Sequence, residues 1–458
     1  MISGDKWELE EIKKGDLFCI VLGLCYLCQI KETTMRVLIV NTSEKTGGAA
    51  VASNRLMNAL NNNGVKARML VRDKETDEIT VAPVGHYWKA QFAFLWERLC
   101  IFFHLHLRRE HLFEIDIANA GIDITRTRYF KEADIIHLAW VNQGMLSLKG
   151  IRKILDSGKP VVWTMHDLWP ATAICHYSRG CNSYQTACHD CRLLPGGGGK
   201  NDLSAKVWRK KHKIIHNSTI HFVTCSKWLQ RQAVKSGLFH HQQVTAIPNP
   251  INTHIFAKGD KNEARRALGL PLRENIILFV SQRVTDERKG MAYFVDALRH
   301  LVEKHPDIAK NTVVAILGGH SEDIAAELPL TAYPLGYVSD EHKIVNVYNS
   351  ADVFVLPSLE DNLPNTIMEA MACGVPCVGF DVGGIPEMID HLTTGYVAKF
   401  RDSDDLADGI AWALDDSNHE RLSHNSVAKV VKNYSEHAVA MQYLDVYTDA
   451  LAQKRYNI

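Results

Sequence analysis

Short runs of apolar, often β-branched residues alternate along the chain with longer segments whose apolar residues recur at helical spacing. The short runs are typical of buried strands, and the longer pattern is typical of amphipathic helices. This alternation predicts βαβ units and parallel sheets. We expect strands at Val37–Val40, Ala67–Val71, Ile135–Leu138, Val161–Thr164 and Ile220–Thr224, and a second series at Ile276–Val280, Val313–Leu317, Val353–Leu356 and Cys377–Phe380.

A polar segment separates the two series of strands. The stretch "IPNPINTHIFAKGDKNEARRALGLP" is rich in proline, asparagine and charge, which marks a connection, and we place the domain boundary near Pro250–Lys258. The pattern therefore predicts two Rossmann-like α/β domains, residues 35–252 and 253–435, facing a cleft. Ligands of open α/β sheets bind at the carboxyl ends of the strands, so we expect the functional site in that cleft.

The two ends of the chain differ from its middle. Residues 1–34 precede "MRVLIV", a strand pattern that begins at a second methionine, and we interpret them as an unstructured extension. The apolar run Leu17–Ile30 is short for a membrane span, which needs ~20 apolar residues. Residues 436–458 predict an amphipathic helix that returns to the N-terminal domain. Its apolar positions are Val439, Met441, Leu444, Tyr447 and Leu451.

Composition narrows the function classes. Hydrophobic residues make up 46% of the 458 positions and charged residues 23%, the composition of a soluble globular protein, and we expect it in the cytoplasm. Lys+Arg and Asp+Glu both total 52, a balance that argues against a nucleic-acid partner. No G-x-G-x-x-G follows the first expected strand, which argues against a dinucleotide-dependent oxidoreductase.

The stretch "PSLEDNLPNTIMEAMACG", residues 357–374, reads as a strand end, a polar loop and a helix capped by Asn365 or Thr366. A loop and helix start expose backbone N–H groups and a positive dipole end, which suit a phosphate. Asp361 and Glu369 would flank a ligand there. In the alternative reading, Glu369 is only a favourable charge near a helix N-terminus, worth ~0.3–1 kcal/mol.

This stretch resembles the E-x7-E signature of retaining family-4 glycosyltransferases of GT-B fold, whose usual form reads roughly P-S-x-x-E-G-F-G-x-x-x-x-E-A-x-A-x-G. Alignment on "EAMACG" places Asp361 at the first glutamate position and Glu369 at the second, and leaves Glu360 as a bystander. Aspartate is one methylene shorter than glutamate, and "NLPN" replaces "GFG". We therefore expect contacts to the donor sugar that differ from the family norm.

Other segments resemble this family in the same order, from about Met35 to the C-terminus. "NTSEKTGGAAVASNRLMNAL" resembles its glycine loop, with Gly47 and Gly48. "VVWTMHDLWP" resembles a strand end whose histidine, His166, lies near the donor sugar. "LGYVSDEHKIVNVYNSADVFVLPS" resembles the base-binding turn and the helix after it.

"LFVSQRVTDERKG" resembles the family's basic loop, and Lys289 matches the family lysine. The position of the family arginine is occupied here by Arg283 or Gln282, and we interpret Arg288 as a solvated loop charge. A leaving nucleotide diphosphate gains negative charge, which positioned Lys and Arg side chains stabilise. We expect this arrangement to replace a metal ion, so no cofactor is expected for catalysis.

The resemblance implies transfer of a sugar, with retention of configuration, from a nucleotide-diphosphate sugar to a glycan or lipid-linked acceptor in bacterial surface polysaccharide synthesis. The alternatives are a nucleotide-sugar epimerase of the same fold and a non-catalytic nucleotide-sugar-binding protein. The implied catalytic residues are His166, Asp361 and Lys289. The implied donor-binding residues are Arg283, Lys289, Tyr337, Val338, Asp361, Asn362, Leu363, Asn365 and Glu369.

Four cysteines gather in an insert at residues 175–191, spaced C-x5-C-x6-C-x2-C: Cys175, Cys181, Cys188 and Cys191. Four thiolates suit a closed, structural zinc site, which would order a segment that has little core of its own. His176 and His189 are alternative ligands. Free thiols and two disulfides are the competing interpretations, and a reducing cytoplasm disfavours the disulfides.

The segment "YWKAQFAFLWERLCIFFHLHLRREH" predicts a helix with an aromatic stripe. Such a stripe either packs on the sheet, which is the usual case, or lies in a membrane interface at the inner face of the cytoplasmic membrane. The stripe consists of Trp88, Phe92, Leu95, Leu99, Phe102 and Phe103.

Overall fold

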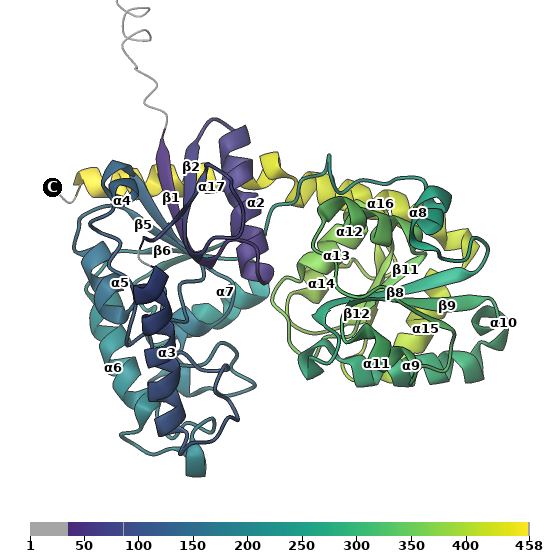
Figure 1. The fold of residues 1–458 in the computed structure, drawn as a ribbon, viewed down its shortest axis with the longest axis horizontal. Coiled ribbons are helices and arrows are strands. Elements are labelled where there is room, and N and C mark those ends of the chain that lie inside the picture. Colours follow the sequence, from purple (N-terminus) through teal and green to yellow (C-terminus); the bar gives the residue numbers. More distant parts are fainter. Residues whose placement is uncertain (1–34, 86, 457–458) are drawn as a thin grey trace, which may run out of the picture. The chain divides into compact units, whose positions relative to one another are not determined.

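Two parallel β-sheets organise the part of the chain that the computed structural model describes, residues 35–85 and 87–456 (Figure 1). The expected extension at 1–34 lies outside these residues. The first sheet has the strand order β3-β2-β1-β4-β5-β6-β7. Its strands are β1 Arg36–Ser43, β2 Lys66–Asp73, β3 Val81–Pro83, β4 Ile135–Leu138, β5 Val161–Met165, β6 His221–Thr224 and β7 Gln243–Ala246.

The second sheet has the order β10-β9-β8-β11-β12-β13, again parallel throughout. All nine strands expected from the sequence are present in the two sheets, so the α/β prediction is confirmed. The second sheet consists of β8 Asn275–Arg283, β9 Thr312–Gly319, β10 Ala332–Pro334, β11 Val353–Leu356, β12 Cys377–Phe380 and β13 Gly395–Ala398.

Helices cover the faces of each sheet, as the hydrophobic strands require. Around the first sheet lie α2 Gly48–Asn62, α3 Tyr87–His104, α4 Arg128–Glu132, α5 Leu148–Leu155, α6 Leu203–His216 and α7 Lys227–Ala233. Around the second lie α8 Lys261–Leu268, α9 Met291–Lys304, α10 Pro306–Ala309, α11 Ser321–Ala325, α12 Glu341–Ser350, α13 Asn365–Ala372, α14 Ile385–Met388, α15 Ser403–Ala413 and α16 Asp416–Tyr434.

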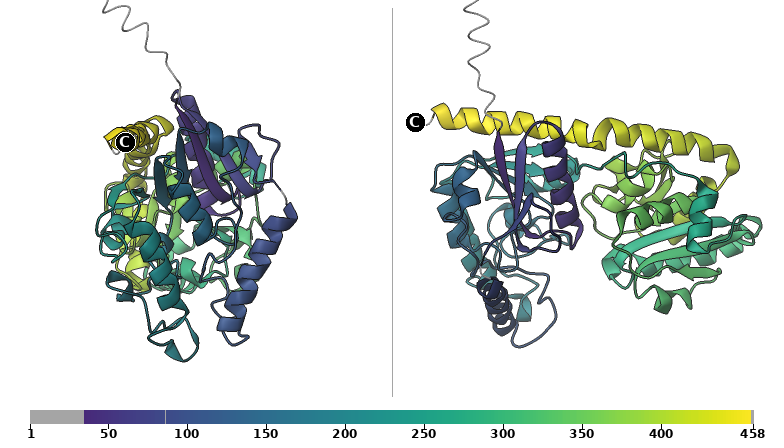
Figure 2. Two further views of the ribbon diagram at one scale, coloured as in Figure 1. Left: turned by 90° about the vertical axis from the view of Figure 1, so that its left-hand side faces the viewer. Right: turned by 45° about the horizontal axis from the view of Figure 1, so that its top comes forward.

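The last helix, α17 Glu436–Tyr456, returns to the first sheet (Figure 2). The Tyr447 hydroxyl lies 2.5 Å from His137 Nδ1 on β4, and the Tyr443 hydroxyl lies 2.9 Å from Thr164 Oγ1 on β5. Met441, expected on the buried face, is instead 45% exposed. The helix is therefore oriented by its two tyrosines, whose hydroxyls find partners in the sheet.

In each sheet the order in which strands are added reverses beside the first strand. β1 lies between β2 and β4, and β8 lies between β9 and β11. Loops leave such a switch point in opposite directions and open a crevice at the carboxyl ends of the strands. The fold thus predicts where a ligand binds in each half of the chain. Within the described ranges, no helix is long and apolar enough to cross a membrane.

Candidate functional site

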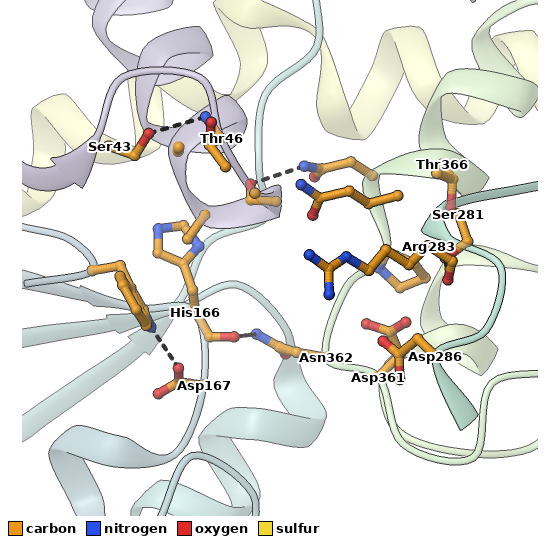
Figure 3. Close-up of a pocket in the computed structure, with 18 of the residues that line it drawn as sticks. Ser43, Thr46, His166, Asp167, Ser281, Arg283, Asp286, Asp361, Asn362 and Thr366 are labelled. Atoms are coloured by element: carbon orange, nitrogen blue, oxygen red, sulfur yellow. Dashed lines mark hydrogen bonds between the residues drawn. The ribbon is translucent and has the colours of Figure 1, made fainter. Parts of the chain in front are cut away.

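A cleft of about 1070 Å³ opens at the two switch points and is lined from both sheets. The loops after β1, β4 and β5 form one wall, and the loops after β8 and β11 form the other. Figure 3 shows His166 and Arg283 reaching toward the same space from opposite sides. Of the residues expected from sequence, Gly47, Gly48, His166, Arg283, Lys289, Asp361, Asn362, Leu363 and Asn365 line the cleft.

Two helix N-termini face the cleft. α2 begins at Gly48, directly after Gly47, whose φ of 94° is a conformation that favours glycine. α13 begins at Asn365, and its N-cap is Pro364 rather than the predicted Asn365 or Thr366. The Asn365 side chain donates instead to the Gly48 carbonyl, at 3.1 Å, and so joins the two helix starts. Backbone N–H groups and two positive dipole ends make this region suited to an anion.

Three cations of the basic loop line the cleft, Arg283, Arg288 and Lys289, and a fourth lining cation, Arg72, is paired with Asp73. The interpretation of Arg288 as a solvated loop charge is wrong. Its guanidinium donates to the Glu360 carbonyl at 3.0 Å, pairs with Asp286 and packs over the Tyr177 ring. Contacts from both domains therefore hold Arg288 at the cleft, and sequence spacing alone does not reveal these contacts.

The residue after Lys289, Gly290, must be a glycine because the backbone packs closely there. It adopts φ +74°, and a Cβ there would lie 1.9 Å from the Pro357 carbonyl oxygen. The basic loop can approach the end of β11 this closely only without a side chain at position 290. This contact brings Lys289 within reach of Asp361.

Asp361 is held by the basic loop. Its Oδ2 accepts from Lys289 Nζ at 2.6 Å and from Ser358 Oγ at 3.2 Å, and Arg288 lies 3.5 Å away. Burial alone would raise the pKa of this carboxyl, but Lys289 and Arg288 outweigh it and hold the pKa below its usual range. Asp361 is therefore a carboxylate that shares Lys289 with any anion entering the cleft.

His166 reaches the cleft from the end of β5. Burial lowers the pKa of its imidazole to about 4, partly against the effect of Asp167, so the ring is neutral at pH 7. Nε2 is buried without a hydrogen-bond partner in the described part of the chain. The His166 carbonyl accepts from Asn362 Nδ2 at 3.2 Å, which ties the two walls together. A neutral imidazole of this kind can hydrogen-bond a hydroxyl group.

A second chamber of about 340 Å³ continues from the cleft and shares five lining residues with it. Behind it, Asp167 accepts from Trp140 Nε1 at 2.8 Å and lies 2.7 Å from His176 Nδ1. His176 Nε2 lies 2.6 Å from Asp116. Burial would lower the pKa of His176, but Asp167 and Asp116 raise it to about 10. This buried imidazolium between two carboxylates fixes the wall built by the cysteine-rich insert.

Three expected donor-binding residues do not line the cleft. Glu369 is buried, with one oxygen 2.8 Å from Arg55 of α2 and the other accepting from the Tyr348 hydroxyl at 2.8 Å. Tyr337 is 64% exposed, and Val338 packs against the core of the second sheet. In this structure Glu369 and Val338 have other contacts and Tyr337 is mostly exposed, so the three side chains lie outside the cleft. The donor-binding roles of Glu369, Tyr337 and Val338 stay predictions.

The four cysteines of the insert are free thiols. Among the residues described, no group of three or more His, Cys, Asp or Glu side chains is placed to hold a metal ion, so the geometry does not fit a preformed zinc site. His176 has both ring nitrogens engaged by carboxylates and is not available as the alternative ligand, whereas His189 pairs with Asp190 through Nδ1 alone. Zinc binding stays a prediction, which elemental analysis of the full chain tests.

Several lining residues were missed at the sequence level. The signal that could have found them is position, since each lies at or after the carboxyl end of a strand, or within the insert. They include Thr46, Arg72, Asp73, Glu75, Trp140, Gln143, Tyr177, Ser281 and Asp286.

Comparisons with known proteins agree with this geometry. The family described as Glycosyltransferase Family 4 matches residues 46–255, and Glycosyl transferases group 1 matches residues 260–429. A glycosyltransferase of uncharacterised activity from Methanocaldococcus jannaschii is 27% identical over 74% of this chain and 90% of its own. Several other curated relatives match over only about half of their own length.

Solved structures share the fold. Sucrose-phosphate synthase from Thermosynechococcus elongatus has a TM-score of 0.63 at 19% identity, covering 92% of this chain and 100% of its own. HepE from Anabaena, solved with UDP and glucose, has a TM-score of 0.59 at 16% identity, covering 91% and 100%. Two parallel sheets, a cleft at both switch points and two family matches in register with them lead to one conclusion: the chain belongs to the family-4 glycosyltransferases of GT-B fold.

Proposed function

We propose that the protein transfers a sugar, with retention of configuration, from a nucleotide-diphosphate sugar to a glycan or lipid-linked glycan acceptor in bacterial surface polysaccharide synthesis. The observation that carries this proposal is the convergence of the three basic-loop cations and two helix N-termini on one cleft. A diphosphate is the anion that such an array suits. The shared fold of HepE, solved with UDP and glucose, supports a nucleotide donor.

The cations give the leaving diphosphate its electrostatic stabilisation. In this proposal Lys289, Arg283 and Arg288, which line the cleft, stabilise the negative charge that develops as the sugar leaves and take the place of a metal ion. Asp361 holds the transferred sugar, and the neutral imidazole of His166 hydrogen-bonds one of its hydroxyls. Asn362, which joins the two walls through His166, keeps these groups in register.

The second chamber receives the acceptor. Its walls combine aromatic rings with charged groups that are already paired, such as Arg179 with Glu114 at 2.9 Å. Paired charges and aromatic faces suit a neutral polyhydroxyl ligand better than a free anion. We place the protein at the inner face of the cytoplasmic membrane, where a lipid-linked acceptor would meet it.

A donor screen tests the function. The purified full chain is incubated with a panel of nucleotide sugars, with and without a mixture of glycan acceptors, and released nucleotide is measured. We expect release from one donor only when an acceptor is present, and a product with the donor's anomeric configuration by NMR. Sugar isomerisation without acceptor would indicate the epimerase. Donor binding without turnover under every condition would indicate the non-catalytic protein.

A further inference from the structure

Helix α3 turns its large apolar side chains toward solvent. Six of them lie at successive spacings of one, three or four residues, which places them in one stripe along the helix. The helix of a surface layer normally hides such a stripe against the core. The exposed residues are Trp88 at 82%, Phe92 at 67%, Leu95 at 61%, Trp96 at 46%, Leu99 at 44% and Phe103 at 61%.

Polar groups fix the opposite face of α3 against the protein. The buried Glu97 carboxylate accepts from the backbone N–H groups of Ile117, at 3.0 Å, and Ala118, at 2.6 Å. The buried Arg98 guanidinium binds Asp116 and donates to the Leu112 carbonyl. Rotating the helix to turn the stripe inward would break the contacts of Glu97 and Arg98, and leaving buried polar groups without partners costs free energy. The expectation that the stripe packs on the sheet is therefore wrong, and only Phe102 of the expected set is half-buried.

A basic groove runs beside the stripe. It has a volume of about 860 Å³ and lies between α3, α5 and α6, with Cys100 and His104 forming the side contributed by α3. None of the described residues that line it is acidic, although the whole chain carries equal numbers of acidic and basic residues. Five cations line it: Lys149, Arg152, Lys206, Lys210 and Lys213.

An apolar stripe flanked by cations is complementary to one kind of surface. The stripe fits the boundary between headgroups and acyl chains, and the cations fit anionic headgroups beside it. The stripe also exceeds the isolated apolar residues that soluble surfaces normally expose. Because α3 is not long and apolar enough to span a bilayer, it would lie in the interface plane.

We propose that α3 and the basic groove form a docking surface for an anionic lipid bilayer. This surface is separate from the cleft and goes beyond the proposed chemistry. It gives the protein an orientation in which the face of the first sheet that carries α3, α5 and α6 meets the membrane.

Flotation of the full chain with vesicles tests the proposal. The vesicles contain phosphatidylcholine alone or with about one third phosphatidylglycerol. One variant, Phe92→Ser/Leu95→Ser/Phe103→Ser, removes apolar area that is already exposed, so folding is preserved. A second, Lys206→Gln/Lys210→Gln/Lys213→Gln, removes charge. Matched controls are Ile79→Ser/Val431→Ser and Lys66→Gln/Lys343→Gln/Lys432→Gln, which change exposed residues elsewhere.

We expect wild type to float with anionic vesicles and the apolar variant to lose binding on the order of tenfold or more. The lysine variant should lose binding to anionic vesicles and with it most of the salt dependence. Both controls should behave as wild type. Failure of wild type to float, or binding that survives both test variants, would overturn the proposal. So would an apolar variant that changes only the oligomeric state in sedimentation, because the stripe would then bind a second copy.

Nucleotide release with water-soluble acceptors separates this result from the proposed function. We expect the α3 and lysine variants to keep wild-type turnover there, because neither set lines the cleft. Loss of vesicle binding with turnover retained supports the docking surface. Turnover that is absent in every protein would count against the proposed chemistry and leave the flotation result standing.

Discussion

At the residue scale, the central feature is a lysine shared between a carboxylate and the space a diphosphate would fill. Lys289 Nζ lies 2.6 Å from Asp361 Oδ2 in a cleft that also holds Arg283 and Arg288. A charged pair of this kind is satisfied without a ligand, yet it keeps the ammonium group directed at the site. Binding and chemistry therefore place different demands on the two side chains.

Asp361→Asn separates these demands. The substitution keeps the size of the side chain but removes its charge, so Lys289 loses a competitor for phosphate. We expect affinity for the nucleoside diphosphate to be unchanged or tighter, while transfer turnover falls by roughly 10- to 100-fold through the lost contact to the sugar. Calorimetry and nucleotide-release assays give the two quantities. Parallel losses of affinity and turnover would argue against this division of roles.

His166 makes a pH prediction. Its folded-state pKa of about 4 lies below the ordinary value of 6.5. Between these pH values the imidazole is protonated in the unfolded chain but neutral in the folded protein. Stability is therefore retained above pH 6.5 and falls as pH drops toward 4. His166→Gln should lose less stability over that window in thermal unfolding. An equal loss in both proteins, or an NMR titration midpoint for His166 near 6.5, would contradict the assignment.

At the element scale, the sequence pattern predicts central strands well and edge strands poorly. The nine predicted strands are mostly buried apolar runs, whereas β3, β7, β10 and β13, which were missed, are the edges of the two sheets. An edge strand is covered less, so it needs no continuous apolar run; β7, for example, has the pattern QVTA. The helix α13 was found, but its cap was not, because Asn365 serves a contact to α2 that no local rule encodes.

In the site, too, residues of local motifs were predicted, and residues that depend on distant contacts were not. Glycines, Lys289, Asp361 and His166 occur in local motifs, and all of them reach the cleft. Arg288 packs on Tyr177, and His176 contacts Asp116, which is 60 residues away in sequence; local spacing does not reveal such distant partners. Glu369 occupies the expected motif position, yet Arg55, from a different domain, binds its carboxylate.

The docking of α17 gives a prediction at this scale. Tyr447→Phe removes the partner of His137 Nδ1 and leaves a buried polar atom unsatisfied, so we expect a loss of about 1–3 kcal/mol in unfolding free energy. Tyr443→Phe should cost less, because Thr164 Oγ1 keeps its contact to His137 Nε2 at 2.8 Å. Denaturant unfolding measures both. Equal, negligible effects would mean that α17 does not pack on the sheet in solution.

At the scale of the whole molecule, one cleft serves two parts of the chain that are far apart in sequence. Hydrogen bonds from Asn362 to His166 and from Asn365 to Gly48, and the ion pair of Glu369 with Arg55, join its walls. In the proposed function, a donor bound at the second sheet would thereby be presented to groups of the first. Family membership, the anion-binding wall and the neutral His166 are consistent with sugar transfer at this junction.

Calorimetric titration of wild type and Lys289→Ala with UDP, GDP and ADP tests the central claim most directly. The account predicts that one nucleoside diphosphate binds wild type and that Lys289→Ala weakens this affinity by roughly 10- to 100-fold, the loss of one charge-assisted hydrogen bond. Circular dichroism confirms that the variant is folded. Binding of none of the three, or undiminished affinity in the folded variant, would contradict the claim that the cleft holds the donor diphosphate.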